Sequence, residues 1–294
     1  PGSAGTMAPA SVAAPGSGPN TAAQAPRHIF ILTTARCKST ISLRILAGTW
    51  GDVVCEPFTQ AYYRDRGADV PSVAWPDNYD DGKKLLRERV ARADVAGRRL
   101  VAKDLAYQAL PGMLDAEFLG WVRETFHIIY LTRKPRDIAL SIGRHIEKTN
   151  EPPSNFVGYT GLAELHATTC MLPGTFENVE ATIDPDPASF IRRSWAATAM
   201  PLAPECEPLP SLPILSAEEQ MGCGFNLWPA WYDKAVGCAG YEPGFSENKT
   251  LPPLGAVFQR EVDAHLPLME MFMGMVHERL GVGVGGDESP AGGA

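Results

Sequence analysis

A seven-residue segment near the N-terminus concentrates side chains that can bind phosphate. Residues 34–40 read Thr-Ala-Arg-Cys-Lys-Ser-Thr, follow the apolar run 28–32 and precede a pattern typical of a helix. A helix N-terminus binds phosphate because its first N–H groups are unpaired and the helix dipole is positive there. We therefore predict a phosphate site here, with an ordinary capped turn as the alternative. The candidate ligands are Arg36, Cys37, Lys38, Ser39 and Thr40.

A second set of candidate ligands follows residues 126–132, the run with the strongest strand pattern. Arg133 comes directly after this run, and Ser141 stands eight residues further on. An Arg at the end of a strand presents a guanidinium fork that binds phosphate through two parallel hydrogen bonds. Pro135 fits the first turn of a helix, where its missing N–H costs nothing. A helix start alone explains Pro135 but leaves the Arg133 and Ser141 spacing unexplained.

Both motifs resemble those of the sulfotransferases that use 3′-phosphoadenosine-5′-phosphosulfate (PAPS) as sulfonate donor. The family's loop commonly reads P-[KR]-S-G-[ST]-T, with which residues 35–40 align. Its second motif reads R-[ND]-P-[RK]-D-x-x-x-S, with which residues 133–141 align. Ala35, Cys37 and Lys38 depart from the family pattern, which has Pro, Ser and Gly at these places. The resemblance is nearer to bacterial and fungal small-molecule or carbohydrate enzymes than to the hormone type.

The resemblance covers residues 28–148 well and the closing segment loosely, and it implies a role for each ligand. Arg36 would contact the bridging oxygen and the sulfonate during transfer. Lys38 would help Arg36 to stabilise the leaving 5′-phosphate. The other implied ligands are Ser39 and Thr40 for the 5′-phosphate, and Arg133 and Ser141 for the 3′-phosphate.

A carboxylate at the end of the second apolar run is the candidate general base. Residues 55–58 read Cys-Glu-Pro-Phe and resemble the E-P-[FL] segment of several sulfotransferases, in which the Glu is the candidate base. The resemblance therefore implies that Glu56 takes the acceptor proton. Asp104, after the third apolar run, is the second candidate. The alternative interpretation of Glu56 is a structural carboxylate paired with a loop cation such as Arg36.

Alternating strand and helix patterns position these motifs. The predicted strands are residues 28–32, 52–55, 100–104 and 126–132, and the predicted helices are residues 39–49, 80–96, 116–125 and 136–148. Such alternation predicts an α/β fold in which helices flank a parallel β-sheet. With the motifs above, we expect a P-loop nucleotide-binding, sulfotransferase-like fold.

We expect one domain, residues 28–283, between two tails. Residues 1–27 and 284–294 are rich in Gly, Pro and Ala, a composition typical of disorder. Residues 1–6, which precede Met7, are interpreted as a remnant of cloning. The tails therefore carry no part of the predicted site.

The second half of the chain has a different texture from the first. Residues 151–255 hold most of the prolines, which predicts an irregular substrate-binding or lid region. One helical stretch, residues 188–199, interrupts it. An apolar helix at residues 257–280 carries a methionine cluster that we interpret as core filling.

Composition narrows the classes of binding partner that we expect. The formal net charge of −8 at pH 7 disfavours nucleic acid and polyanionic glycans, so we expect a small-molecule acceptor. The six cysteines show no metal-ligand spacing, which favours mostly free thiols in a reducing compartment and no bound metal. The sequence shows neither a signal peptide nor a membrane span, so we expect a cytoplasmic protein without a membrane partner. Composition gives no indication of the oligomeric state.

Two other functions fit parts of the pattern. Lys38-Ser39 would suit the Walker A motif of an ATP-dependent small-molecule kinase, but Leu32 and Cys37 stand where that motif has glycines. A kinase also needs an acid to hold Mg²⁺, for which Asp104 is the candidate. A non-catalytic nucleotide-binding protein is the third possibility, since Lys38 replaces the loop glycine.

Overall fold

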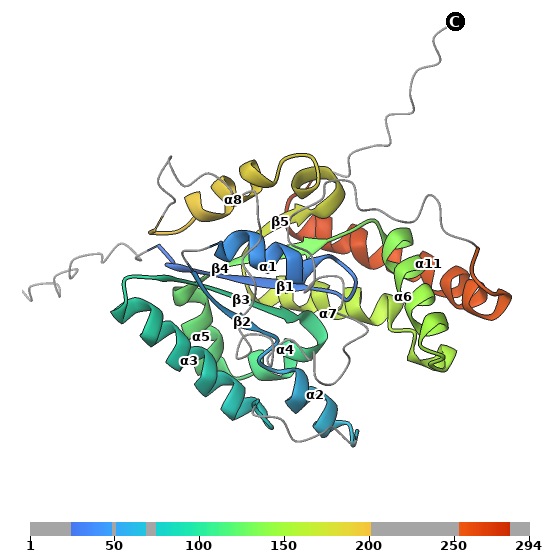
Figure 1. The fold of residues 1–294 in the computed structure, drawn as a ribbon, viewed down its shortest axis with the longest axis horizontal. Helices are drawn as coiled ribbons and strands as arrows, with labels where there is room; N and C mark the ends of the chain where they lie inside the picture. Colours follow the sequence, from blue (N-terminus) through green and yellow to red (C-terminus); the bar gives the residue numbers. More distant parts are fainter. Residues whose placement is uncertain (1–24, 49–50, 69–74, 201–252, 283–294) are drawn as a thin grey trace, which may run out of the picture.

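The computed structural model describes residues 25–48, 51–68, 75–200 and 253–282. Its centre is a five-stranded sheet in the order β2-β3-β1-β4-β5, parallel throughout (Figure 1). The strands are β1 (His28–Thr33), β2 (Gly51–Cys55), β3 (Arg99–Leu105), β4 (Phe126–Thr132) and β5 (Thr175–Asn178). The predicted α/β fold with a parallel sheet is therefore confirmed.

Helices cover both faces of the sheet, as buried parallel strands require. In Figure 1, α1 and α8 lie above the sheet, α3 and α5 lie below it, and α6 and α11 lie to the right. The helices of the first half are α1 (Ser39–Ala47), α2 (Thr59–Asp65), α3 (Tyr79–Val95), α4 (Ala106–Met113), α5 (Ala116–Thr125) and α6 (Pro135–Lys148). Those of the second half are the 3₁₀ turn η1 (Pro153–Asn155), α7 (Gly158–Met171), the π-helix η2 (Val179–Ile183), α8 (Pro187–Ala196) and α11 (Ala256–Arg279).

The strand register fixes where the candidate site lies. Thr33, the last residue of β1, is paired with Leu105 of β3 and with Leu131 of β4. The Thr33 hydroxyl also donates a hydrogen bond of 2.8 Å to the Leu131 carbonyl. Because parallel strands end at the same edge, the segments after β1, β3 and β4 all begin there.

The region predicted to be irregular contributes to the core. Its described part contains α7, β5, η2 and α8, and β5 extends the central sheet beside β4. The helical spacing of α7 is obscured by Gly158 and Gly161, but Gly161 has a packing role: an added Cβ would overlap the Oγ1 of Thr34. The prediction of an irregular segment is thus wrong for most of residues 158–183, whereas the helical stretch predicted at residues 188–199 is confirmed by α8. Residues 201–252 lie outside the described residues.

The ends of the predicted domain need one adjustment. Within the predicted N-terminal tail, Pro26 accepts a hydrogen bond of 2.7 Å from the Ala199 backbone, and Arg27 forms an ion pair of 2.9 Å with Asp94. These residues therefore belong to the folded domain. Residues 1–24 and 283–294 lie outside the described residues.

The methionines of α11 divide between core and surface. Met269 and Met273 are buried, which agrees with core filling. Met271 and Met275 are exposed. The core-filling interpretation therefore holds for the two buried methionines only.

Candidate functional site

The loop between β1 and α1 has a strained backbone. Arg36 and Lys38 have φ angles of 65° and 53°, in the left-handed region that favours glycine. Lys38 is also the N-cap of α1 and contributes no side-chain cap. Such conformations are uncommon for residues with a Cβ and concentrate at functional sites. The Lys that replaces the expected loop glycine thus adopts the glycine-like conformation itself.

The structure brings the two predicted motifs together. The Arg36 Nε donates a hydrogen bond of 3.0 Å to the Ser141 Oγ on α6. The Arg133 Nη1 donates one of 3.3 Å to the Arg36 carbonyl. These residues are about a hundred positions apart in the sequence and meet where β1 and β4 end. Ser39 and Thr40 form the first turn of α1 beside them and are buried.

Two carboxylates from η2 and its C-cap contact the cations of this site. Glu180 Oε1 lies 2.6 Å from the Arg133 Nε, and both oxygens of Asp184 lie 3.0 and 2.9 Å from the Lys38 Nζ. All four side chains are at most 16% exposed. Ion pairs this sheltered are screened less by solvent than surface pairs are.

Cys37 occupies the interior side of the same loop. It is fully buried, and burial raises the pKa of its thiol to about 12, although the charge of Arg133 acts in the opposite direction. A thiol in this environment stays protonated at neutral pH. Because its side chain is also closed to solvent, the contribution of Cys37 as a phosphate ligand is limited to its backbone N–H.

His145 is a further member of the site that the sequence did not single out. It lies one helical turn after Ser141 on α6. Burial, followed by the positive charge of Arg36, lowers the pKa of His145 to about 4. The imidazole is therefore neutral at physiological pH and adds no charge to the cations of the site.

The segment around Glu56 is sealed inside the protein. Glu56 has a φ of 55° and is fully buried. Its carboxylate forms an ion pair with Lys103 of β3 and accepts a hydrogen bond of 2.9 Å from the Thr59 hydroxyl. The Trp75 indole N–H donates to its backbone carbonyl at 3.0 Å. The ion pair with Lys103 therefore supports the alternative interpretation of Glu56 as a structural carboxylate.

Asp104 lies in the same sealed group. Its two carboxylate oxygens accept backbone hydrogen bonds from Phe58 at 3.0 Å and from Leu105 at 2.7 Å. Burial, followed by the negative charge of Glu56, raises the pKa of Asp104 well above its usual value. Of the two buried carboxyls, Asp104 is therefore the one that tends to keep its proton, and Glu56 is the charged partner of Lys103.

The cysteines divide into two chemical states. Cys37 and Cys170 are free thiols, whereas Cys55 at the end of β2 takes part in a disulfide bond. The expectation of free thiols is therefore wrong for Cys55. The three remaining cysteines, Cys206, Cys223 and Cys238, lie outside the described residues.

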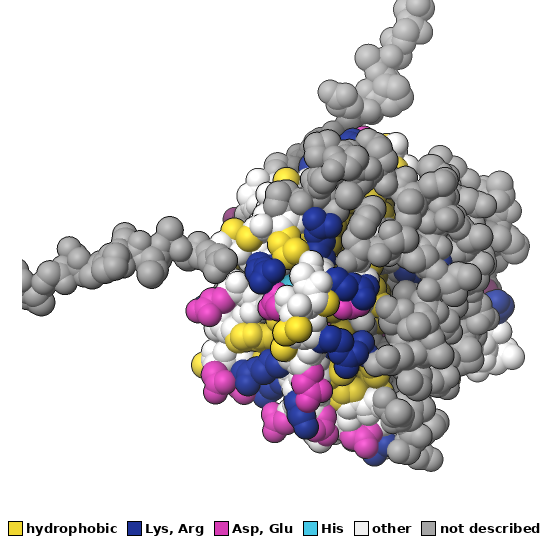
Figure 2. Space-filling view, turned by 60° about the vertical axis from the view of Figure 1, so that its left-hand side comes forward, with side chains coloured by type: hydrophobic (Ala, Val, Ile, Leu, Met, Phe, Trp, Pro, Cys, Tyr) yellow, Lys and Arg dark blue, Asp and Glu magenta, His cyan; other side chains and the backbone are white. Residues whose placement is uncertain are grey.

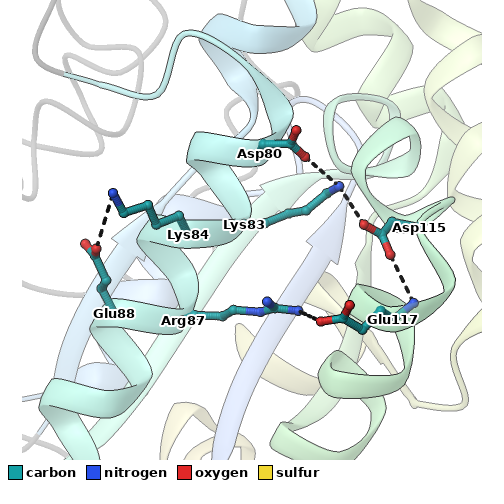
Figure 3. Close-up of a pocket in the computed structure, with 7 residues that line it drawn as sticks. All are labelled: Asp80, Lys83, Lys84, Arg87, Glu88, Asp115 and Glu117. Carbon is teal, nitrogen blue, oxygen red and sulfur yellow. Dashed lines mark hydrogen bonds and ion pairs between the residues drawn. The ribbon is translucent and has the colours of Figure 1, made fainter.

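A charged pocket of about 310 Å³ lies away from this site, between α3 and α5. In Figure 3, Lys83 reaches both Asp80 and Asp115, at 3.0 and 2.9 Å, and Arg87 reaches Glu117 at 2.9 Å. Charges of both signs also alternate over the lower part of the surface in Figure 2, where these helices lie. The pocket's cations are paired with its own acids, so we assign it no ligand.

The described residues contain neither a metal-ligand cluster nor a membrane-spanning helix. No group of three or more His, Cys, Asp or Glu side chains in the described part of the chain is arranged to hold a metal ion. None of the helices within the described ranges combines the length and apolar character needed to cross a bilayer.

Besides His145, sequence reasoning missed the charged partners Lys103, Glu180 and Asp184. Lys103 follows directly from strand pairing, because the register places it beside Cys55 and so next to Glu56. The four-residue spacing of Glu180 and Asp184 is a helical signal, but the segment lies where we predicted irregular structure. Nothing in the sequence connects these two acids to Lys38 and Arg133.

Comparisons with known proteins give a similar solved structure but no matching family. No family model matches the chain, and neither does any curated protein. Among solved structures, the sulfotransferase domain of the olefin synthase from Synechococcus PCC 7002 is similar, with a TM-score of 0.39 and 12% identity over 82% of this chain and 95% of that one. A likeness of this extent carries no argument about the reaction.

Proposed function

We propose that this protein is a sulfotransferase that moves sulfonate from PAPS to a hydroxyl or amine of a small acceptor. The observation that carries the proposal is the meeting of Arg36, Arg133 and Ser141 beside the N-terminus of α1 and the first two turns of α6. Two helix N-termini with adjacent cations suit a nucleotide that carries two separate phosphate groups.

The donor set fits such a nucleotide in its chemistry. Arg133 and Ser141 would bind the 3′-phosphate, and Lys38, Ser39 and Thr40 would bind the 5′-phosphate. The Thr34 hydroxyl has no hydrogen-bond partner within the described part of the chain, but it lies against Gly161 of α7 and is closed to solvent, so we assign it no ligand.

The protein's role in the transfer is positioning and electrostatics. Bound PAPS supplies the sulfonate: a bond forms from the acceptor to sulfur, and the bond from sulfur to the 5′-phosphate oxygen breaks with its electron pair. Arg36 and Lys38 stabilise the negative charge on that leaving oxygen. Glu56 remains our choice as the base for the acceptor proton, with Asp104 second. Since Glu56 is buried, this role requires it to exchange Lys103 for the acceptor.

The environment of Asp104 argues against the kinase alternative. A Mg²⁺ ligand must be deprotonated and must have an oxygen free to face the ion. Asp104 is fully buried, and both of its carboxylate oxygens accept hydrogen bonds from backbone N–H groups. Its pKa is also raised. It is therefore a poor magnesium ligand.

A non-catalytic nucleotide-binding protein is the second candidate. It is favoured by the ion pairs of Lys38 with Asp184 and of Arg133 with Glu180, which neutralise the cations without a nucleotide. This candidate and the sulfotransferase both predict nucleotide binding. Release of adenosine-3′,5′-bisphosphate from PAPS in the presence of hydroxylated acceptors separates them.

Binding measurements test the proposal. We expect adenosine-3′,5′-bisphosphate to bind more tightly than AMP in isothermal titration, and ATP with Mg²⁺ to bind no better than AMP. Arg133→Ala should weaken bisphosphate binding by about tenfold or more, the scale of one charge-assisted hydrogen bond. Arg136→Ala is the matched control, because Arg136 is exposed three residues further on. Equal affinity for the bisphosphate and AMP would remove the assignment.

A further inference from the structure

The two acids near η2 are arranged alike. Glu180 contacts the Arg133 guanidinium and accepts a second hydrogen bond, 3.3 Å long, from the Lys134 backbone N–H. Lys134 is the N-cap of α6. Asp184 contacts the ammonium group of Lys38, which is the N-cap of α1. Each carboxylate therefore pairs with a cation, and Glu180 also accepts an N–H at the start of a helix.

This is the environment that a protein offers to a phosphate group. The positive end of a helix dipole and a neighbouring cation favour an anion, and a carboxylate oxygen accepts the same hydrogen bonds as a phosphate oxygen. In this protein, two internal carboxylates satisfy two such places at once. They are the same two places to which the proposed function assigns the 5′-phosphate and the 3′-phosphate.

We propose that Asp184 and Glu180 are internal substitutes for the two phosphate groups and give up Lys38 and Arg133 when the nucleotide binds. The inference rests on the proposed function, because it assigns the displaced contacts to a 3′,5′-bisphosphate. Asp184 is exchanged for the 5′-phosphate and Glu180 for the 3′-phosphate. The acids thereby set the affinity for each phosphate separately.

The exchange has a physical reason in the protein without nucleotide. An unpaired cation in a sheltered site is strongly destabilising, because its desolvation is not compensated. The acids supply the missing charge while the site holds no ligand. A phosphate then replaces a carboxylate, so the cations keep an anionic partner in both states.

The backbone of this segment is anchored in the core. Val179 and Ile183 are fully buried against α1 and α8. Glu180 keeps 16% of its side chain exposed. The segment is a π-helix, a rare conformation that occurs frequently at functional sites. The Glu180 carboxylate can therefore rotate away without unpacking the core.

Three single variants test the exchange: Asp184→Asn, Glu180→Gln and Glu177→Gln. Glu177 is the matched control because it lies on β5, three residues before Glu180, and pairs with Arg193 at 3.0 Å instead of with a site cation. All three variants remove one negative charge from the same part of the chain. The probes are adenosine-3′,5′-bisphosphate and AMP, measured by isothermal titration.

The expected pattern differs between the two probes. Asp184→Asn should tighten binding of both nucleotides by about tenfold, because both carry a 5′-phosphate. Glu180→Gln should tighten binding of the bisphosphate by about as much and leave AMP unchanged, because AMP lacks the 3′-phosphate. Glu177→Gln should change neither affinity.

A stability measurement guards against variants that fold poorly. Without nucleotide, Glu180→Gln should melt below the wild type, because Arg133 loses its charged partner. At saturating bisphosphate the two melting temperatures should converge. A difference that persists with nucleotide bound would mean that Glu180 stays on Arg133, which overturns the exchange.

The other outcomes are equally decisive. Weaker bisphosphate binding by either variant would make these acids positioning residues for the cations and overturn the inference. An equal gain for Glu177→Gln would reduce the effect to general charge and overturn it as well. If the wild type prefers the bisphosphate to AMP and the variants have the same two affinities as the wild type, only the exchange fails. If no protein binds either nucleotide, the proposed function itself fails.

Discussion

The two polar clusters of this protein lie at the same edge of the sheet and differ in what they can do. At the ends of β1 and β4, Lys38 and Arg133 hold acids that remain partly exposed. At the ends of β2 and β3, the Glu56 and Lys103 side chains are at most 1% exposed. Solvent access separates a cluster in which a ligand can replace the acids from one in which Glu56 must first leave a buried ion pair.

Burial decides the difference because it sets the cost of an unpaired charge. A charge that solvent partly reaches loses less when its partner leaves than one in the interior, which has no water to replace that partner. Both clusters contain left-handed residues next to a strand end or a helix start: Glu56 in one, and Arg36 and Lys38 in the other. Backbone strain therefore marks both clusters, and exposure distinguishes their roles.

The largest expected effect compares the same substitution in the two clusters. Lys103→Met should lower the free energy of unfolding by about 3–5 kcal/mol, because it leaves the Glu56 charge buried without its cation. Lys38→Met breaks the ion pair with Asp184, which solvent reaches, and should cost clearly less. Denaturant unfolding of both variants measures the difference. Equal losses would abolish the distinction between a sealed and an exchangeable cluster.

The sequence predicted most of the framework that positions these clusters. The strands ending at Thr33 and Thr132 were found because both are short, largely apolar runs, and Pro135 marked the start of α6. The helix α7 was missed because Gly161 weakens its pattern, and only the closeness of Thr34 explains that glycine. Local patterns therefore sufficed wherever the reason for a residue is local.

For the site, the sequence predicted which residues are present but not their partners. The meeting of Arg36 with Ser141 was implied by two motifs, each readable by itself. The acids Glu180 and Asp184 belong to no motif, and their role appears only when β5 is placed beside β4. Contacts between distant segments depend on topology, which local spacing does not encode.

A second comparison sets two thiols against each other. Cys37 is buried with a pKa raised to about 12, whereas Cys170 is exposed. Since the thiolate is the reactive form, iodoacetamide at pH 8 should label Cys37 at least about a hundredfold more slowly than Cys170. Peptide mapping by mass spectrometry measures both rates in one sample. Rapid labelling of Cys37 would show that the loop opens and that the site is less well packed than the structure has it.

The same pKa shift has a consequence for stability. In the unfolded chain, the Cys37 thiol has the ordinary pKa of 9.0. In the folded protein, burial raises this pKa to about 12. The contribution of Cys37 is therefore fully present below pH 9 and is lost as the pH rises from 9 towards 12. Cys37→Ala should show a smaller decline in unfolding free energy over this window.

The smallest expected effect concerns the strained backbone of the exchangeable cluster. At Lys38, where φ is 53°, a Gly variant should be more stable than an Ala variant by about 1 kcal/mol, because only the Ala variant keeps a Cβ. Both variants lose the ion pair with Asp184, so their difference isolates the strain. The matched control is Lys84, an exposed residue inside α3, where Gly should instead be less stable than Ala by about 1 kcal/mol. Denaturant unfolding of the four variants gives the two differences. The same sign at both positions would mean that Lys38 is unstrained, and the loop would then differ from a regular helix start in its side chains alone.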